Sequence, residues 1–294
     1  MTRAGIVTVA GRPNAGKSTL LNRIIGQKLS IVSPKPQSTR DRIVGIHSTD
    51  DIQMIILDTP GLLNPKYELQ RAMRATALTA LKDADVIVYL IDASEGTPIE
   101  SLAAAASLDR APTAPTIVAL NKADVLSKTQ RAALVEKHPD AALISATTGE
   151  GVDALLSRAG QLLPPSPFLY PADEISTQQV RFFVAELIRE TALEQLGDEV
   201  PYSIACEIDE FREDRTPVYI RAVLHVERDS QKRILIGTKG ERIRSIGQSA
   251  RAKIEAFLEP QSVYLDLWVK VLPNWRKNIN ALARFGYRVQ EKTE

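Results

Sequence analysis

The chain has 294 residues, of which 44% are hydrophobic and 25% charged, and its formal net charge is +1. These are ordinary values for a globular chain of about two domains, and they argue neither for nor against a nucleic-acid partner. Its one cysteine, Cys206, excludes an internal disulfide framework and fits a reducing compartment. We expect this cysteine to be a small buried residue in a strand.

The N-terminus has a short apolar run before a glycine loop, which predicts a buried strand and not a signal peptide. No apolar stretch approaches the roughly 20 residues needed to span a membrane. We therefore expect a soluble cytoplasmic protein, with peripheral membrane contact left open.

Five near-continuous apolar runs in the first 160 residues predict the strands of a parallel sheet that is buried on both faces. They are Gly5–Gly11, Met54–Gly61, Asp85–Ser94, Thr116–Asp124 and Ala141–Thr147. Helical patterns alternate with these runs at Lys17–Ile25, Leu69–Lys82, Ile99–Asp109, Lys128–Lys137 and Val152–Leu162. Arg42–Ser48 leaves no room for a crossover helix before the next run, so it predicts one antiparallel strand. The order predicts an α/β domain with a doubly wound mixed sheet.

A proline-rich stretch follows this domain. Four prolines between Leu163 and Ser176 disfavour helix and favour extended backbone, which indicates a linker of limited flexibility. We predict a first domain at 1–165, a linker at 166–175 and a second domain at 176–294.

The remainder predicts an α+β domain in the order helix, strand, strand, helix, helix, strand. The first helix begins near Val180 and is expected to end at Gly197 as its C-cap residue. Apolar residues then alternate in Ser203–Phe211 and Pro217–Glu227, as in half-buried antiparallel strands. Two helices, at 230–236 and from about 241, and a last strand at 262–272 complete the domain.

The stretch "GRPNAGKST", Gly11–Thr19, contains the pattern G-x-x-x-x-G-K-[ST] between a predicted strand and a predicted helix, which is the context that supports a phosphate loop. Its backbone N–H groups and the helix N-terminus are expected to surround phosphate oxygens. Lys17 is placed for the β- and γ-phosphates, and Ser18 for Mg²⁺. The predicted nucleotide contacts in this loop are Gly11, Asn14, Ala15, Gly16, Lys17, Ser18 and Thr19.

Three further motifs each follow a predicted strand. In "DTPG", Asp58 is expected to hold the magnesium shell and the Gly61 N–H to meet the γ-phosphate. In "NKAD", a carboxylate at Asp124 can accept from the ring N–H and the exocyclic amino group of guanine. Adenine has no such donor pair and would leave a buried carboxylate unpaired, at a cost of about 1–3 kcal/mol.

The remaining residues of these motifs complete a guanine site. Lys122 is expected to lie against the base, and a backbone N–H of the turn at Ser145 and Ala146 can reach the guanine carbonyl. Asn121 is also assigned to the site. All the motifs stand at the carboxyl ends of strands, where open α/β sheets bind ligands. The set predicts a GTP- and GDP-binding enzyme that uses Mg²⁺ and hydrolyses GTP.

The segment "PQSTRDRI" between the first two motifs is a candidate switch, because a hydroxyl there can reach Mg²⁺ when a γ-phosphate is present. Ser38 and Thr39 both qualify, and we predict Thr39. Leu62 occupies the position of the water-orienting glutamine of Ras-type enzymes. Leucine cannot polarise water, so backbone, another residue or an ion must do so; the predicted catalytic residues are Lys17, Thr39, Gly61 and Asn14.

A second glycine pair, Gly237 and Gly240, joins two predicted helices and lacks the Lys-Ser pair of a triphosphate site. A G-x-x-G turn between helices is typical of KH domains, which grip about four nucleotides of single strand. Residues 228–253 carry 8 basic and 2 acidic residues around it, the charge expected for a phosphodiester partner. The predicted RNA contacts are Arg233, Ile236, Gly237, Thr238, Lys239, Gly240, Arg242 and Arg244.

Several nearby residues have two interpretations. Ile236 and Ile243 line the RNA groove or belong to the core, with the core favoured. Trp268 and Lys270 contact RNA, or the tryptophan covers another helix. Leu272–Asn278 is basic and aromatic, and is a further candidate RNA contact.

Together the phosphate loop, "STRDRI", "DTPG", "NKAD", "SAT", "IGTKGERIRSIG" and "LDLWVKVLPNW" resemble, nearly end to end, the Era-type bacterial GTPases with a C-terminal type II KH domain. The resemblance implies binding near the 3′ end of small-subunit ribosomal RNA, a role in assembly of the small ribosomal subunit, and peripheral association with the inner membrane. We expect a monomer.

The resemblance also bears on two residues of the switch and the phosphate loop. The family commonly shows two threonines where this chain has Ser38 and Thr39. In related GTPases an asparagine at the position of Asn14 binds K⁺, which acts where an arginine finger otherwise would. The alternative is that Asn14 only shapes the loop.

Three other functions compete with this one. A GTP-dependent membrane or cell-cycle signalling protein would use its C-terminal domain to bind protein. A relative of the tRNA-modifying GTPases is disfavoured because no reactive cysteine stands near the C-terminus. A factor with two GTPase domains is disfavoured because one N-K-x-D motif occurs.

Overall fold

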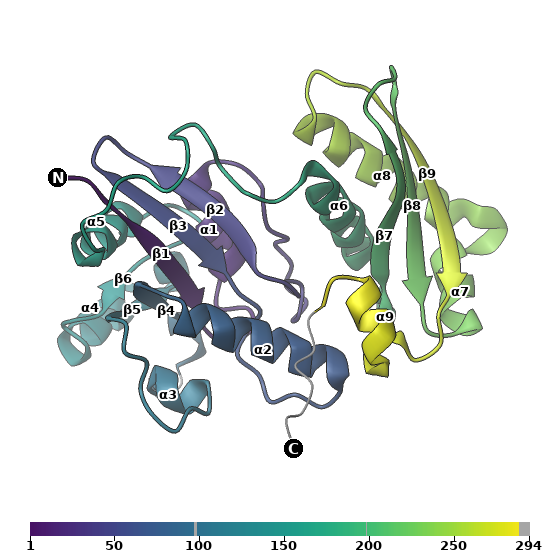
Figure 1. Ribbon diagram of the computed structural model, residues 1–294. Coiled ribbons are helices and arrows are strands. Elements are labelled where there is room, and N and C mark those ends of the chain that lie inside the picture. Colours follow the sequence, from purple (N-terminus) through teal and green to yellow (C-terminus); the bar gives the residue numbers. More distant parts are fainter. Residues whose placement is uncertain (97–98, 198, 288–294) are drawn as a thin grey trace. The chain divides into compact units, whose positions relative to one another are not determined.

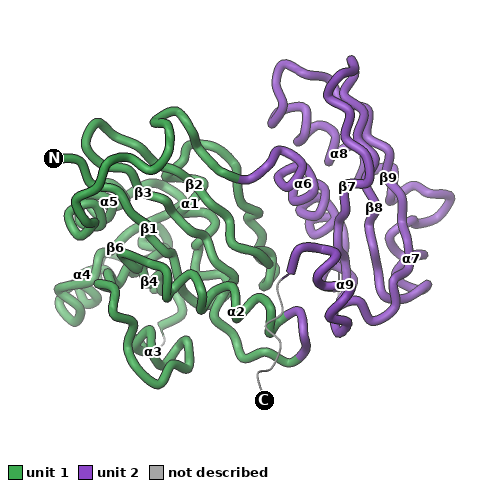
Figure 2. The backbone as a smooth tube through the Cα atoms, viewed as in Figure 1, with its two compact units in different colours: residues 1–66, 70–177 green, residues 67–69, 178–294 purple. Residues whose placement is uncertain are grey.

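The computed structural model describes residues 1–96, 99–197 and 199–287. The chain forms two compact units, one of residues 1–66 and 70–177 and one of residues 67–69 and 178–294 (Figure 2). The last residues of the predicted second domain, 288–294, lie outside the described residues. No helix in the described part of the chain is long and apolar enough to cross a membrane.

The first unit is built on a six-stranded sheet with the order β2-β3-β1-β4-β5-β6 (Figure 1). Only the β2–β3 pair is antiparallel among these described strands, which confirms the mixed, doubly wound sheet. The strands are β1 Arg3–Ala10, β2 Ile43–Ser48, β3 Ile52–Asp58, β4 Val86–Asp92, β5 Thr116–Asn121 and β6 Ala142–Leu143. The helices are α1 Lys17–Ile25, α2 Glu68–Lys82, α3 Leu102–Ala105, α4 Lys128–Lys137 and α5 Val152–Leu162.

The alternation of side chains along β3 shows why helices cover both faces of this sheet. Met54 lies against α5, where a Cβ on Gly160 would be 3.2 Å from its methyl carbon. Ile55 and Leu57 point the other way and pack with Ala80 of α2. Neighbouring strand residues face opposite sides of a sheet, so a continuous apolar strand needs a cover on each side.

Two elements are shorter than the sequence predicts. The helix expected at Ile99–Asp109 is α3, which begins after its N-cap Ser101 and ends at Ala105. Ser107 then takes a positive φ of 49°, and Leu108 turns back to pack against the core around Leu102. The run at Ala141–Thr147 contributes β6, whose two residues pair with Ala119 and Leu120 before the chain turns.

The proline-rich stretch runs along the first unit. Both Leu169 and Tyr170 donate their backbone N–H groups to the Gln53 side-chain oxygen, at 2.8 and 3.0 Å. Further on, the Ile175 carbonyl accepts the Ile46 N–H at 2.8 Å from edge strand β2. These contacts explain how a segment without helix or strand is held in place.

The second unit has the element order that the sequence predicts for a type II KH domain. Its three-stranded sheet runs β7-β8-β9, with β7 antiparallel and β9 parallel to the central β8. The strands are β7 Ala205–Arg212, β8 Val218–Val226 and β9 Val263–Val271. The helices are α6 Val180–Gln195, α7 Asp229–Ile236, α8 Glu241–Phe257 and α9 Ile279–Arg284.

One core joins the sheet of this unit to its helices. Fully buried Val184 and Ile188 of α6 pack with Ile246 and Ile254 of α8 over the inner face of β8. Cys206 lies in β7 as expected, but it is half-buried, and burial raises the pKa of its thiol. The core also ends α6 early: Leu196 is buried and extended and is itself the C-cap residue, so the prediction of Gly197 as the C-cap is wrong.

Candidate functional site

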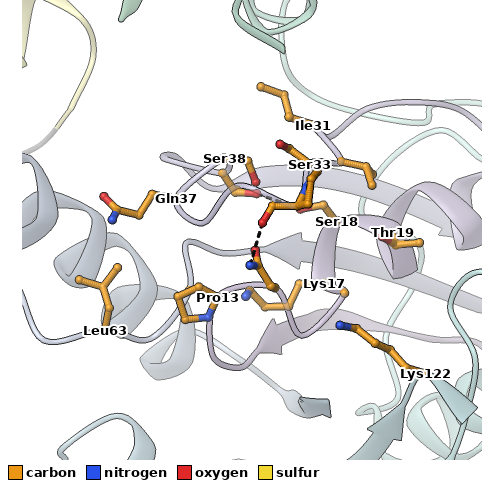
Figure 3. Close-up of a pocket in the computed structure, with 16 residues that line it drawn as sticks. Pro13, Lys17, Ser18, Thr19, Ile31, Ser33, Gln37, Ser38, Leu63 and Lys122 are labelled. Carbon is orange, nitrogen blue, oxygen red and sulfur yellow. Dashed lines mark hydrogen bonds between the residues drawn. The ribbon is translucent and has the colours of Figure 1, made fainter. Parts of the chain in front are cut away.

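A pocket of about 340 Å³ opens at the carboxyl end of the first sheet. It is lined by the loop after β1 with the start of α1, by the segment between α1 and β2, by Gly61 and Leu63 after β3, and by Lys122 after β5. Figure 3 shows Pro13, Lys17 and Ser18 on one side, with Ser33 and Ser38 opposite them. The parallel strands β1, β3 and β5 end at the same edge, which brings motifs far apart in sequence to one place.

The phosphate loop has a backbone shape that needs glycine at Gly16. This residue has φ 97°, and a Cβ there would lie 2.2 Å from the Asn121 side-chain nitrogen. Asn14 also has positive φ, 64°, which asparagine tolerates better than most residues. The loop curls so that the Lys17 ammonium donates to the carbonyls of Gly11 and Arg12, at 3.2 and 2.9 Å.

Lys17 and Asp58 are two buried groups of opposite charge at the base of the pocket. Burial lowers the pKa of Lys17 to about 8, and the Asp58 carboxylate partly offsets this shift. Burial also raises the pKa of Asp58, while Lys17 and three hydroxyl groups oppose the rise. Burial therefore disfavours the charged form of both groups. A bound anion would stabilise the charge on Lys17, and a bound cation would stabilise the charge on Asp58.

The three predicted magnesium residues contact one another. The Ser18 hydroxyl lies 2.8 Å from the Thr39 hydroxyl and donates to Asp58 Oδ2 at 2.7 Å. Asp58 Oδ1 is buried and has no hydrogen-bond partner among the described residues. Two hydroxyls and a carboxylate with an unused oxygen are the hard oxygen donors that Mg²⁺ prefers, so this cluster fits the ion. Ser38 also lines the pocket.

Sequence reasoning missed Ser30. This serine is 1% exposed and its hydroxyl donates to Asp58 Oδ2 at 2.7 Å. It lies outside every motif, in a loop that follows α1, so no pattern pointed to it.

Asn121 ties two loops of the pocket together. Its side-chain nitrogen donates to the Ala15 carbonyl at 2.8 Å, and its side-chain oxygen accepts the Ala146 N–H at 2.9 Å. The Ser145 N–H donates to the Glu150 carbonyl at 2.9 Å. Both N–H groups expected to reach the guanine carbonyl are thus already used inside the protein, and the next N–H in the turn belongs to Thr147.

The side chains of the "NKAD" loop are oriented by neighbours that the motif does not contain. Ser145 donates its hydroxyl to Asp124 Oδ1 at 2.6 Å. Lys122 has φ 68° and forms an ion pair with Asp92 at the end of β4. Burial alone would raise the pKa of Asp92, but hydrogen bonds from Lys122 and Ser94 lower it below its usual value.

The segment after Asp58 packs on the phosphate loop. Leu62 is 4% exposed, donates its N–H to the Gly11 carbonyl at 2.9 Å, and places its side chain in the core around Ala10 and Tyr89. A Cβ on Gly61 would lie 2.7 Å from the Pro13 nitrogen. Leu62 therefore points away from the pocket, and glycine is required before it.

In the second unit, the turn at Gly237–Gly240 leads into α8 and has the shape of a backbone clamp. Gly237 has φ 74° and ψ 177°, and Gly240 has φ 78° and ψ 14°. Lys239, between them, has φ 50° and is exposed. Thr238 beside it is also exposed, so the turn presents both the threonine and the lysine to solvent.

The basic residues around this turn divide into two groups. Lys253 donates to Glu190 and Glu194 at 3.0 and 2.7 Å, so its charge is compensated. Arg251 pairs with Glu255 at 3.9 Å. The other six form no ion pair within the described part of the chain: Arg228, Lys232, Arg233, Lys239, Arg242 and Arg244. The uncompensated positive charge is therefore concentrated at the turn.

The apolar residues near the turn are half-buried. Ile243 packs against the core of the second unit, as the favoured interpretation predicted, and Ile236 is also half-buried. Trp268 is 53% exposed, so it does not serve as cover for a helix. Trp275 is fully buried and donates to the Ser203 carbonyl at 2.8 Å. The Trp275 ring therefore belongs to the core, and RNA contact by the rest of Leu272–Asn278 stays a prediction.

The fold and these two loops define a P-loop GTPase domain joined to a KH domain. Residues 6–122 match the family described as 50S ribosome-binding GTPase, and residues 199–276 match the KH domain family. GTPase Era of Ectopseudomonas mendocina is 43% identical over 297 residues, covering 98% of each chain. GTPase Era of Pseudomonas aeruginosa is 41% identical, covering 97% of this chain and 95% of its own.

Two solved structures are similar over the whole chain. A point variant of Aquifex aeolicus Era bound to GDP and AlF₄⁻ has a TM-score of 0.90 and 36% identity, covering 98% of this chain and 100% of its own. Era in complex with MgGDPNP and nucleotides 1506–1542 of 16S ribosomal RNA has the same TM-score, identity and coverage. The chain belongs to the Era family of GTPases. It is a GTP hydrolase that binds GTP and GDP together with Mg²⁺.

Proposed function

We propose that this GTPase is a nucleotide-dependent switch that binds single-stranded RNA near the 3′ end of small-subunit ribosomal RNA and assists assembly of the small ribosomal subunit. The observation that carries the proposal is the pairing of two phosphate-binding loops in one chain. One has the Ser18–Thr39–Asp58 oxygen cluster. The other has unpaired cations around Gly237–Gly240, counted over the described residues. A related Era structure holds 16S ribosomal RNA nucleotides, which supports the choice of RNA.

In the nucleotide site, Gly11, Asn14, Ala15, Gly16 and Thr19 form the cradle for the phosphates. Lys17 gives up its two carbonyl contacts and donates to the β- and γ-phosphates. Asp124, oriented by Ser145, accepts two hydrogen bonds from guanine, and Lys122, held by Asp92, covers the base. The turn at Ser145 and Ala146 presents a backbone N–H to the guanine carbonyl. Because the N–H groups of these two residues already donate to Glu150 and Asn121, the Thr147 N–H is the favoured donor.

Ser18, Thr39 and Asp58 would hold Mg²⁺, which neutralises charge that develops on the phosphate oxygens during hydrolysis. Lys17 adds a fixed positive charge, and the Gly61 N–H faces the γ-phosphate. Leu62 is buried and cannot orient water. The backbone around Gly61, together with an ion that Asn14 would hold, would therefore place the attacking water.

We propose K⁺ as that ion. The Asn14 side-chain nitrogen donates to the Pro34 carbonyl at 3.0 Å, so the residue joins the phosphate loop to the switch segment. That orientation leaves the side-chain oxygen of Asn14 as the atom that would contact a cation. A monovalent ion beside the β- and γ-phosphates would stabilise the same charge that an arginine finger stabilises in other GTPases.

The RNA site comprises Arg233, Ile236, Gly237, Thr238, Lys239, Gly240, Arg242 and Arg244. The glycines let a sugar–phosphate chain approach the N-terminus of α8, and the cations around the turn screen its charge. This site lacks an adjacent lysine–serine pair like Lys17 and Ser18 of the first loop, so it would hold a polymer without cleaving it. GTP orders the Thr39 segment, and we propose that this ordering alters the affinity of the second domain for RNA.

The remaining proposals rest on membership in the Era family. We propose a monomer with a GTPase domain at 1–165, a linker at 166–175 and a KH domain at 176–294. We also propose that it is cytoplasmic and associates peripherally with the inner membrane.

The function is tested by crosslinking the full chain to cellular RNA and sequencing the bound fragments. We expect fragments from the 3′ end of small-subunit ribosomal RNA, and we expect Gly237→Asp with Gly240→Asp to remove them while GTP hydrolysis continues. Recovery of proteins without RNA, unaffected by these substitutions, would favour the signalling alternative instead.

A further inference from the structure

Buried Ser30 and half-buried Asn22 connect the end of α1 to the carboxylate of Asp58. Asn22 lies in the last turns of α1, which ends at a glycine C-cap, Gly26. Its side-chain oxygen accepts the N–H groups of Leu29 and Ser30, at 2.9 and 2.8 Å. Its side-chain nitrogen donates to the Ser30 carbonyl at 2.8 Å. The backbone of Ser30 is therefore fixed on both its donor and its acceptor side.

The fixed serine directs its hydroxyl at one oxygen of Asp58. Ser30 and Ser18 each donate to Asp58 Oδ2 at 2.7 Å, and Thr39 lies 3.5 Å from the same atom. The other oxygen, Oδ1, is buried without a hydrogen-bond partner among the described residues. Two donors on one oxygen fix the rotation of the carboxylate and leave Oδ1 as its available acceptor.

We infer that Ser30, held by Asn22, is a positioning residue that keeps Asp58 oriented for Mg²⁺ in both nucleotide states. The inference rests on the proposed magnesium site and extends it to residues outside the motifs. Thr39 belongs to the segment that we expect to order with the γ-phosphate, so we expect its contribution to Mg²⁺ binding to depend on GTP. Ser30 is held by α1 instead, so we expect its hydrogen bond to Asp58 to persist with GDP.

The test is the Mg²⁺ dependence of nucleotide release from the full chain. Dissociation of a fluorescent GDP, and of a fluorescent non-hydrolysable GTP analogue, is followed in EDTA and across a Mg²⁺ titration. We expect Ser30→Ala to raise the Mg²⁺ concentration for half-maximal slowing by about tenfold or more with both nucleotides, because residues that orient metal ligands typically contribute 10–100-fold to metal affinity. Release in EDTA should equal that of the wild type.

Four further variants serve as comparisons for Ser30→Ala. Asn22→Ala should shift the Mg²⁺ midpoint in the same direction, and the double variant should shift it by less than the product of the two effects. Thr39→Ala should shift the midpoint with the GTP analogue alone. Thr8→Val removes another buried hydroxyl, which donates to the Ala80 carbonyl at 2.7 Å, and should leave the midpoint unchanged.

Two results would overturn the inference. One is an unchanged Mg²⁺ midpoint in Ser30→Ala while Ser18→Ala shifts it, which would leave the proposed magnesium site standing. The other is equally faster release from Ser30→Ala in EDTA and in Mg²⁺, which would indicate a general packing role. An unchanged midpoint in both serine variants would remove the magnesium assignment as well.

Discussion

The Asn121 side-chain oxygen accepts the backbone N–H of Ala146 at 2.9 Å in the first unit. The same amide donates to the Ala15 carbonyl at 2.8 Å. One buried side chain thus joins the phosphate loop to the turn that faces the base. The relationship gives Asn121 a role in shaping the site that does not require contact with the nucleotide.

Asn121→Ala should weaken GDP binding by about 30–150-fold, because it removes two buried hydrogen bonds whose loss costs about 1–1.5 kcal/mol each. Asn121→Asp keeps an acceptor for Ala146 but loses the donor to Ala15, so its loss should be smaller. Equilibrium titration with fluorescent GDP measures both. Equal losses in the two variants would argue that the Ala146 bond contributes nothing.

GDP affinity should depend on pH through Lys17, whose pKa burial lowers to about 8. Below pH 8 the ammonium is already charged, and above it a proton must be taken up before the phosphates can be bound. Affinity should therefore fall between pH 8 and 9, by at most about tenfold per pH unit for one proton. Titration calorimetry in buffers of different ionisation enthalpy measures the uptake, and Lys17→Met should abolish it.

The same shift affects the stability of the nucleotide-free protein. An unfolded lysine has a pKa of 10.5 and the folded one about 8, so the folded state holds fewer protons between these values. The cost of burying the charge is present below pH 8 and disappears as the pH rises toward 10.5. Lys17→Met should therefore stabilise the nucleotide-free chain at pH 7 more than at pH 10, as measured by urea unfolding.

The two glycines of the KH turn should differ in their tolerance of alanine. A Cβ on Gly237 would lie 2.7 Å from Arg242 Cβ, and its φ and ψ belong to a region that is essentially restricted to glycine. No atom of the described residues lies within 4 Å of a Cβ on Gly240, whose left-handed φ alone costs about 1–2 kcal/mol. Gly237→Ala should therefore destabilise the second unit by more than Gly240→Ala.

Tryptophan fluorescence during urea unfolding of the full chain measures this difference. Both tryptophans of the protein, Trp268 and Trp275, belong to the second unit, so the signal reports that unit. Equal midpoints for the two variants would contradict the predicted clash at Gly237.

Hydrolysis should be faster in KCl than in NaCl if Asn14 binds K⁺. Asn14→Gly is the matched variant, because glycine tolerates the φ of 64° at this position while it removes the side-chain oxygen. It should lose the K⁺ stimulation, a loss of about tenfold in kcat or about 1.4 kcal/mol, and retain GDP affinity. Equal rates in both salts for the wild-type enzyme would leave Asn14 as a loop-shaping residue.

Motifs at the ends of strands could be predicted from the sequence because the topology of a parallel sheet brings them to one edge. Apolar runs predicted β1 and β3, and the glycine pattern predicted the loop that carries Lys17. The element order of the second domain likewise followed from the alternation of apolar residues in β7 and β8. In each case a local pattern coincides with the tertiary arrangement.

Other features depend on contacts that no local pattern encodes. Ser30 acts through a hydrogen bond to a residue 28 positions away, and Ala146 uses its N–H on Asn121. Burial of Leu196 and the packing of Leu108 against its core ended helices earlier than their helical patterns predicted. Trp275 looked like part of a basic surface, but its ring fills the core while Arg276 pairs with Glu227, with 3.0 Å between Nε and Oε2.

The central claim is that the nucleotide in the first loop controls RNA binding at the second. Its most direct test is the affinity of the full chain for an oligonucleotide from the 3′ end of small-subunit ribosomal RNA, measured by fluorescence anisotropy with Mg²⁺ and either GDP or a non-hydrolysable GTP analogue. We predict different dissociation constants in the two states, and no difference in Thr39→Ala. Identical affinities in the wild-type protein would contradict the coupling, even if each site binds its own ligand.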